Sequence, residues 1–205
     1  MNQKQIGFLL RASTLGCVAG CRVALLENPQ LGGMVVIQPS DDLRIYGIIY
    51  DMHIDDDGLV RQLVTTEHIK PEVIADNRNN RSVPVEISII FCGYQQNGNL
   101  YHLLPPRPPL TLDEVYTCSD AELIEFTSAE RMGYFRHILR GQDYPTAEIL
   151  VSHLKQAAPA HHSQGNSTWI NRAIQELIVL LRDDYPTLMN VLGALADANL
   201  THEEV

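Results

Sequence analysis

The sequence predicts an α+β protein in which a small closed β-barrel is followed by a helical subdomain. Roughly the first 115 residues form short β-rich runs separated by turn residues, a pattern typical of small barrels and sandwiches. From Ser119 onward the apolar residues follow a helical period. The 205 residues are 45% hydrophobic and 20% charged, as in an ordinary globular chain that can bury a core. We expect the barrel at 1–126 and the helical subdomain at 127–205.

The first strands are expected where β-rich runs lie between turn residues. Asp57-Gly58 follows the last of these runs, and this dipeptide favours a tight hairpin because Gly tolerates a positive φ. We therefore predict a hairpin turn there, with 59–65 as its return strand. The runs that precede it are 6–11, 17–23, 34–38 and 44–54.

The clearest strand covers 83–91, where apolar residues alternate with polar ones. Ile90 and Cys92 break the polar face near its end, which predicts a cover on both faces there. Asn97-Gly98 predicts a turn before a run at 100–104. Prolines hold 105–109 in an extended polyproline conformation, and a last strand is expected at 115–118.

The helical part begins with a capping box, since Ser119 is followed three positions later by Glu122. Short helices are expected through Phe126, over 129–139 and over 147–156. A polar linker at 159–165 separates these from two amphipathic helices. The first, over 168–182, has one apolar stripe, and the second begins at Asp184-Tyr185-Pro186. The stripe consists of Ile170, Ala173, Ile174, Leu177, Ile178 and Leu181; the last helix adds Leu188, Val191, Leu192 and Leu195.

The charge of the chain restricts its partners and its environment. A net charge of −10 disfavours broad adhesion to nucleic acid or anionic lipid, because both need clustered Lys and Arg. No segment is apolar over the ~20 residues of a membrane span, and the first residues do not resemble a secretion signal. We therefore expect a cytoplasmic protein whose four cysteines are reduced.

Several classes of enzyme are excluded by missing motifs. A P-loop needs a Gly-rich turn with a Lys that reaches the phosphates, but none of the three lysines (Lys4, Lys70 and Lys155) follows a Gly. No G-x-G-x-x-G is present, so a Rossmann dinucleotide site is excluded as well. Nothing resembles a G-x-S-x-G nucleophile elbow. We predict no catalytic residue and no cofactor.

Three motifs allow a metal site, and each has a simpler interpretation that we favour. Asp55 to Gly58 lacks the spaced oxygen ligands of a calcium loop and fits a solvated turn. Cys17 and Cys21 have no second ligand pair for zinc, and alternation places both thiols on one face of a strand. The adjacent His161 and His162 fall in the polar linker, where a mobile loop is expected. We predict no metal site.

The order of several segments resembles the HAS barrel, which is named for the HerA translocases and the ATP synthase that carry it. Residues 6–13, 31–37 and 46–51 resemble its first three strands. Val83 to Tyr94, the proline run and 114–116 resemble its closing part, so the resemblance covers about residues 5–126. In HerA-like proteins this barrel precedes an ATPase core and helps to assemble a hexameric ring that pumps DNA. Tyr134 to Gly141 stands where that core would begin, but no Walker Lys follows.

This resemblance implies an accessory or assembly factor, without enzymatic activity, for a separately encoded HerA-like DNA-translocating ATPase. Candidate partner-binding residues are the cations Arg78, Arg81 and Arg107 and the apolar pair Val179 and Leu180. That pair widens the stripe of its helix beyond one face, so a second surface must cover it. We expect self-association through 168–197, as a dimer because two-fold closure is the commonest symmetry.

Two other functions stay open. A small-ligand-binding or hydrolytic barrel could place a site in its mouth, using Tyr46, Tyr50 and Arg107. Side chains usually fill the interior of small barrels, which disfavours this alternative. Direct DNA binding through Arg78, Arg81 and Arg107 is disfavoured by the net charge.

Overall fold

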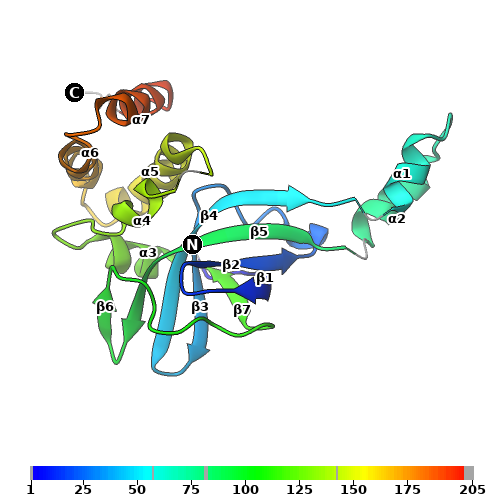
Figure 1. The fold of residues 1–205 in the computed structure, drawn as a ribbon, viewed down its shortest axis with the longest axis horizontal. Helices are drawn as coiled ribbons and strands as arrows, with labels where there is room; N and C mark the ends of the chain where they lie inside the picture. Colours follow the sequence, from blue (N-terminus) through cyan, green and yellow to red (C-terminus); the bar gives the residue numbers. More distant parts are fainter. Residues whose placement is uncertain (1, 57, 81–82, 142, 201–205) are drawn as a thin grey trace.

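The structure joins a closed β-barrel to a layer of helices on one side and a helical arm on another (Figure 1). It is a computed structural model that describes residues 2–56, 58–80, 83–141 and 143–200. The predicted α+β class, with the barrel first and the helices after it, is confirmed.

Six antiparallel strands close the barrel. They follow one another as β2-β1-β7-β3-β4-β5, and pairing of β2 with β5 closes the ring. A seventh strand, β6, extends β5 through a turn at Asn97 and Gly98, whose φ angles of 50° and 78° suit the predicted tight turn. The strands are β1 (Gln5–Ala12), β2 (Gly16–Cys21), β3 (Met34–Ser40), β4 (Leu43–Ile54), β5 (Val85–Gln96), β6 (Asn99–Tyr101) and β7 (Glu114–Thr117).

Apolar side chains from the strands fill the barrel interior. Alternation sends every second residue inward, as in β5, where Val85, Ile87 and Ile89 are buried. Cys17 and Cys21 lie on the inward face of β2, which confirms them as core thiols. The buried interior cluster is Ile6, Leu9, Cys17, Ala19, Cys21, Val35, Ile37, Leu43, Ile45, Ile49, Val85, Ile87, Ile89, Phe91 and Val115.

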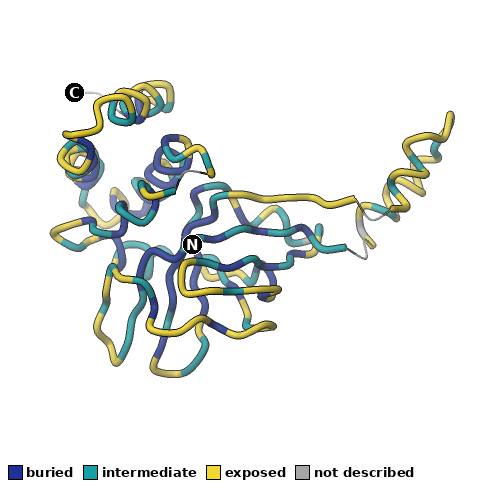
Figure 2. Tube along the Cα trace, viewed as in Figure 1, coloured by how far each residue is buried: buried dark blue, intermediate teal, exposed yellow. Residues whose placement is uncertain are grey.

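The outer face of β3, β4 and β5 is buried under the helices (Figure 2). Met34, Tyr46, Ile48 and Cys92 point outward from these strands and belong to the same core as the helical side chains. This cover explains why the apolar pattern of β5 becomes two-sided near Cys92, as the sequence predicts. The outer face of these strands and the helices therefore share one apolar core, beside the separate core of the barrel interior.

Helix α5 is the centre of the helical layer, because it contacts α3, α4, α6, α7 and β4. Its neighbours pack their apolar stripes against it, and the predicted last two helices are confirmed. The helices are α3 (Asp120–Thr127), α4 (Phe135–Leu139), α5 (Thr146–Ser163), α6 (Trp169–Leu180) and α7 (Tyr185–Asp197). Among the described residues, none of the helices is long and apolar enough to cross a bilayer.

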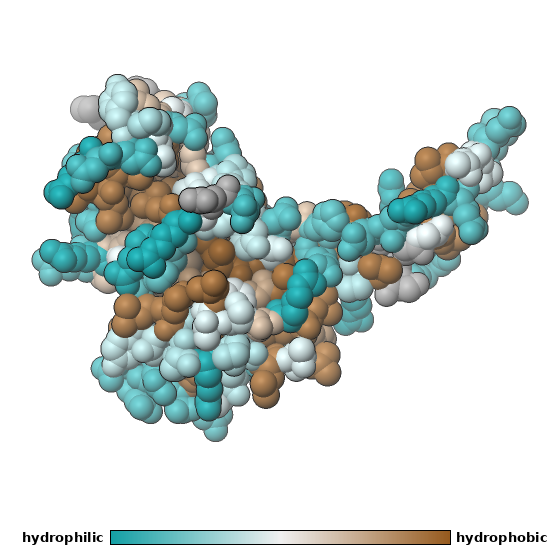
Figure 3. All heavy atoms as spheres, in the orientation of Figure 1, coloured by the Kyte–Doolittle hydropathy of each residue, from teal (hydrophilic) through white to brown (hydrophobic). Residues whose placement is uncertain are grey.

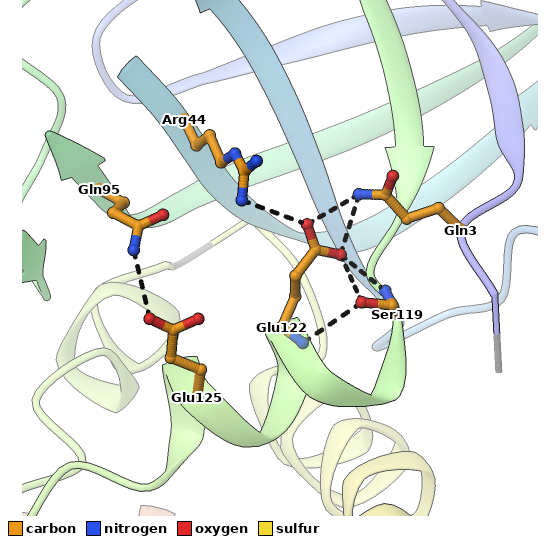
Figure 4. Close-up of polar contacts among 6 residues, drawn as sticks. All are labelled: Gln3, Arg44, Gln95, Ser119, Glu122 and Glu125. Carbon is orange, nitrogen blue, oxygen red and sulfur yellow. Dashed lines mark hydrogen bonds and ion pairs between the residues drawn. The ribbon is translucent and has the colours of Figure 1, made fainter. Parts of the chain in front are cut away.

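The capping box at Ser119 also fastens α3 to the barrel (Figure 4). The Glu122 carboxylate accepts hydrogen bonds from the Ser119 amide at 2.9 Å and the Ser119 hydroxyl at 2.8 Å. It also accepts from the Gln3 side chain at 2.8 and 2.9 Å and lies 3.8 Å from Arg44 on β4. One side chain thus satisfies the first turn of α3 and links it to two barrel segments.

The predicted hairpin after β4 is wrong, since a helical arm replaces the return strand. Helices α1 (Leu59–Val64) and α2 (Pro71–Asn79) extend away from the barrel (Figure 1). The apolar residues of 59–64 lie at i, i+1, i+4 and i+5, which is helical spacing, and Pro71 suits a first turn. β4 pairs instead with β5, where Ile54 lies opposite Val85.

The predicted polar linker at 159–165 is also wrong, because α5 continues to Ser163 with Pro159 inside it. His161 is buried and stacks on Trp169, with ring centroids 4.2 Å apart and planes 7° apart. Its Nε2 lies 2.7 Å from the Thr127 hydroxyl, and the Trp169 indole donates to the Thr127 carbonyl at 3.1 Å. Tertiary packing therefore buries a segment whose composition predicts exposure.

Smaller differences concern the ends of elements. The helix expected over 129–139 forms only as α4, and the strand expected over 100–104 ends at Tyr101. Residues 22–25 leave the second strand, and Val23–Leu25 form a short 3₁₀ turn.

Two buried neutral histidines predict that stability falls in acid. Burial lowers the pKa of His153 and of His161 to about 4, from about 6.5 in the unfolded chain. Since the unfolded state binds protons first, this stability is fully present above pH 6.5 and is lost as the pH falls toward 4. The free energy of unfolding, measured with urea, should be lower at pH 5 than at pH 7 by about 1–2 kcal/mol per histidine. Equal unfolding free energies at the two pH values contradict the prediction.

The arm is predicted to contribute little to the stability of the barrel. Replacing 55–84 by Asn-Gly joins Ile54 to Val85, which already pair, through a two-residue hairpin. Because no described residue of α1 or α2 is buried, the thermal midpoint should stay within about 4 °C of the parent value. The core variant Ile87→Ala serves as the comparison, and it should lower the free energy of unfolding by about 2–5 kcal/mol. Loss of cooperative unfolding in the armless protein contradicts this expectation.

Candidate functional site

Apolar side chains remain exposed where α6 ends and α7 begins. Val179 and Leu180 are 57% and 40% exposed, and Tyr185 and Met189 are 68% and 47% exposed. We call these four residues the α6–α7 surface. In Figure 3, hydrophobic side chains (brown) are visible among hydrophilic ones over the helical part of the molecule.

The folding of α6 and α7 explains why this surface is left open. The opposite side of α6 is buried through Trp169, Ala173 and Leu177. Leu181, which follows α6, is also buried, and the chain then turns into α7, whose first amides are capped by Asp184. The Asp184 carboxylate accepts from the Thr187 amide at 3.2 Å. With these side chains turned inward, Val179 and Leu180 must point away from the core.

A shallow groove of about 430 Å³ lies beside this surface. It runs between α6 and the segment before α4, and it includes Val179 at one end. Its other lining residues are Glu130, Met132, Thr168, Asn171, Arg172, Gln175 and Glu176, and apolar atoms form most of the lining. Exposed apolar residues beside a groove of this kind are typical of a protein-interaction surface.

A second apolar patch lies on the barrel face that the helices do not cover. Phe8 and Leu10 point outward from β1 and are 41% and 39% exposed. The Leu112 amide donates to the Leu9 carbonyl at 2.9 Å, which places Leu112 beside the same strand. We call Phe8, Leu10 and Leu112 the β1 surface.

The structure does not bring all predicted partner-binding residues together. Val179 and Leu180 are neighbours on α6, whereas Arg78 is exposed on α2 in the arm, at the opposite end of the molecule (Figure 1). Arg107 is exposed in the proline segment, and Arg81 lies outside the described residues. The apolar pair therefore belongs to one surface, and the described arginines do not form a joint site with it.

The two tyrosines named for a ligand site in the barrel mouth have different surroundings, since Tyr50 also lines a groove of about 360 Å³ with Arg11, Leu15 and Cys17. Tyr46 is fully buried on the outer face of β4 and packs on Phe126, with ring centroids 4.8 Å apart. Burial raises its pKa to about 12. Tyr50 packs on Tyr144 at 4.9 Å, on the same outer face. Both tyrosines thus hold the helices on the barrel.

A larger cavity of about 800 Å³ lies between α5, the turn before β3 and the segment before β1. Lys4 and Lys155 line it, but so do Glu27 and Asp120. The opposite charges offset one another, so the lining does not select a ligand of one sign.

The thiols lie in environments that suppress their chemistry. Burial raises the pKa of Cys17 to about 12 and raises those of Cys92 and Cys118 as well. A thiol with a raised pKa holds little of the reactive thiolate at neutral pH. Within the described ranges, no three His, Cys, Asp or Glu side chains come together as a metal site.

Sequence reasoning missed the β1 surface and the exposed pair Tyr185 and Met189. The alternation of Phe8 and Leu10 with the inward Leu9 was visible, but alternation alone does not tell which barrel faces the helices cover. Tyr185 and Met189 are four positions apart, a spacing that places them on one side of α7.

Comparison with known proteins gives no relative. No protein family matches the chain, and no curated protein matches it in sequence. The resemblance to the HAS barrel is accordingly supported only by the closed barrel itself.

The α6–α7 surface predicts self-association through 168–197. Leu180→Glu places a charge in the expected interface. It should raise the dissociation constant of the oligomer, measured by light scattering, at least tenfold. The fold should persist, because Leu180 is already partly exposed. Leu15→Glu, an equally drastic change at an exposed leucine of the barrel, is the control and should leave the oligomer intact. A wild-type protein that is monomeric at tens of micromolar contradicts the prediction.

Proposed function

We propose that this protein is an assembly or docking module, without enzymatic activity of its own, for a separately encoded HerA-like DNA-translocating ATPase. The observation that supports it is the combination of a closed barrel packed with apolar side chains and two apolar surfaces left outside it. A filled barrel has no room for a substrate, so its outer surfaces are where it acts.

In this proposal the two surfaces bind different partners. The β1 surface lies on the barrel, which is the part that resembles the HAS domain. In the proposal the ATPase binds to this surface. The α6–α7 surface lies on helices outside that resemblance and serves self-association. The chain contributes no Walker Lys, so nucleotide hydrolysis belongs to the partner.

The proposal predicts a stable complex with a HerA-like ATPase encoded beside this protein's gene. Co-expression should give one peak on gel filtration that contains both proteins. Phe8→Glu with Leu10→Glu should remove this protein from the peak, because two charges would enter the apolar contact. Leu180→Glu is the matched control and should keep the complex.

Two results overturn the proposal. One is clean separation of the wild-type proteins on gel filtration. The other is a complex that survives Phe8→Glu with Leu10→Glu, since such a result would show that the β1 surface is not part of the contact.

A further inference from the structure

The segment 131–140 is strongly cationic in an acidic protein. It contains Arg131, Arg136, Arg140 and His137 but neither Asp nor Glu, although the whole chain carries a net charge of −10. It precedes and forms the short helix α4, beside the loop that follows β6. A local excess of positive charge in such a chain attracts anions to one place.

Hydrogen bonds hold two of these side chains against His102. The carbonyl oxygen of His102 accepts from the Arg136 guanidinium, and it lies 3.2 Å from Nε2 of His137, which must donate to it. These bonds fix both side chains on one side of α4. The guanidinium of Arg136 keeps unused donors, since it has five N–H groups and only one is engaged here, whereas neutral His137 has no N–H left on its ring.

The ring of His102 has a fixed tautomer when it is neutral. Its Nε2 lies 2.9 Å from the Phe126 carbonyl oxygen and must donate to it, so Nδ1 carries no proton. A Cβ atom on Gly133 would lie 3.7 Å from Nδ1 of His102 and 3.7 Å from Nη1 of Arg136. Gly133 therefore lies beside both the His102 ring and the Arg136 guanidinium.

The arginines of this segment form no ion pair among the described residues, although Glu130 directly precedes Arg131. Arg11, Arg44 and Arg61, by contrast, each form one. Burial lowers the pKa of both His102 and His137, and Arg136 lowers both further. Arg140 also acts on His137. The charged side chains that act on the two rings are thus all cationic.

We propose that Arg136, held by the His102 carbonyl and flanked in sequence by Arg131 and Arg140, forms a binding site for a phosphate group, free or carried on a nucleotide. A tetrahedral oxyanion accepts several charge-assisted hydrogen bonds at once, and guanidinium groups suit that geometry. The rings of His102 and His137 lie beside the guanidinium of Arg136 and report on an anion bound there. The site lies outside both apolar surfaces and does not depend on the ATPase proposal.

The test is a titration of the full chain with inorganic phosphate at constant ionic strength and pH 7, followed by the NMR signals of the histidine rings. The signals of His102 and His137 should shift and saturate, while those of the exposed His53 and His68 should not. Arg136→Gln should weaken binding at least tenfold. Because Arg136 is partly buried, the exposed pair Arg131→Gln with Arg140→Gln is a second test and should weaken binding at least threefold.

Arg22→Gln removes one exposed positive charge from the barrel, far along the chain from the cluster, and is the matched control. It should change the affinity less than twofold. A titration with AMP distinguishes free phosphate from a nucleotide as the ligand. Equal affinity for AMP and phosphate indicates that the site recognises the phosphate group alone, and tighter binding of AMP indicates a nucleotide. Shifts that do not saturate, or equal weakening in Arg22→Gln and Arg136→Gln, indicate general screening and overturn the proposal.

Discussion

The helical half of the protein depends on the close approach of one turn to one helix. Gly32 has a φ of +75°. A Cβ atom at this position would lie only 2.5 Å from the backbone nitrogen of His153 on α5. His153 donates from Nδ1 to the Gly32 carbonyl at 3.2 Å, and its Nε2 accepts from the Tyr134 hydroxyl at 3.0 Å. Gln156 adds a bond to the Leu31 carbonyl at 2.7 Å. Only glycine fits this approach, and it fixes α5 on the barrel.

The position of α5 determines which surfaces remain free. Because α3, α4, α6 and α7 all pack on α5, the helices cover the outer face of β3–β5 and leave that of β1 open. The barrel interior is closed by its own strands, so exposed apolar residues are found only on the outside. The same packing holds α4 beside His102, whose carbonyl oxygen accepts from Arg136 and His137. The barrel interior is therefore filled, and the open features of this architecture lie on its outside, including the cavity between α5 and the turn before β3.

Sequence patterns predicted the elements whose own side chains decide their structure. The alternation at 83–91, the Asn97-Gly98 turn, the capping box at Ser119 and the stripe of 168–182 are local signals, and all four are confirmed. The failures came from contacts distant in sequence. Polar composition at 159–165 predicts a linker, but burial of His161 on Trp169 extends α5. The Asp-Gly after β4 predicts a hairpin, but direct pairing of β4 with β5 frees the segment between them.

The central claim is that the Gly32–α5 contact holds the helical layer, and hydrogen exchange in wild-type and Gly32→Ala protein tests it most directly. In the wild type, the amides of α5 should be protected as strongly as those of β4, since both belong to one core. In Gly32→Ala, α5, α6 and α7 should lose protection by at least tenfold, while β1 and β2 keep theirs. Unchanged protection of α5 in Gly32→Ala would contradict the account.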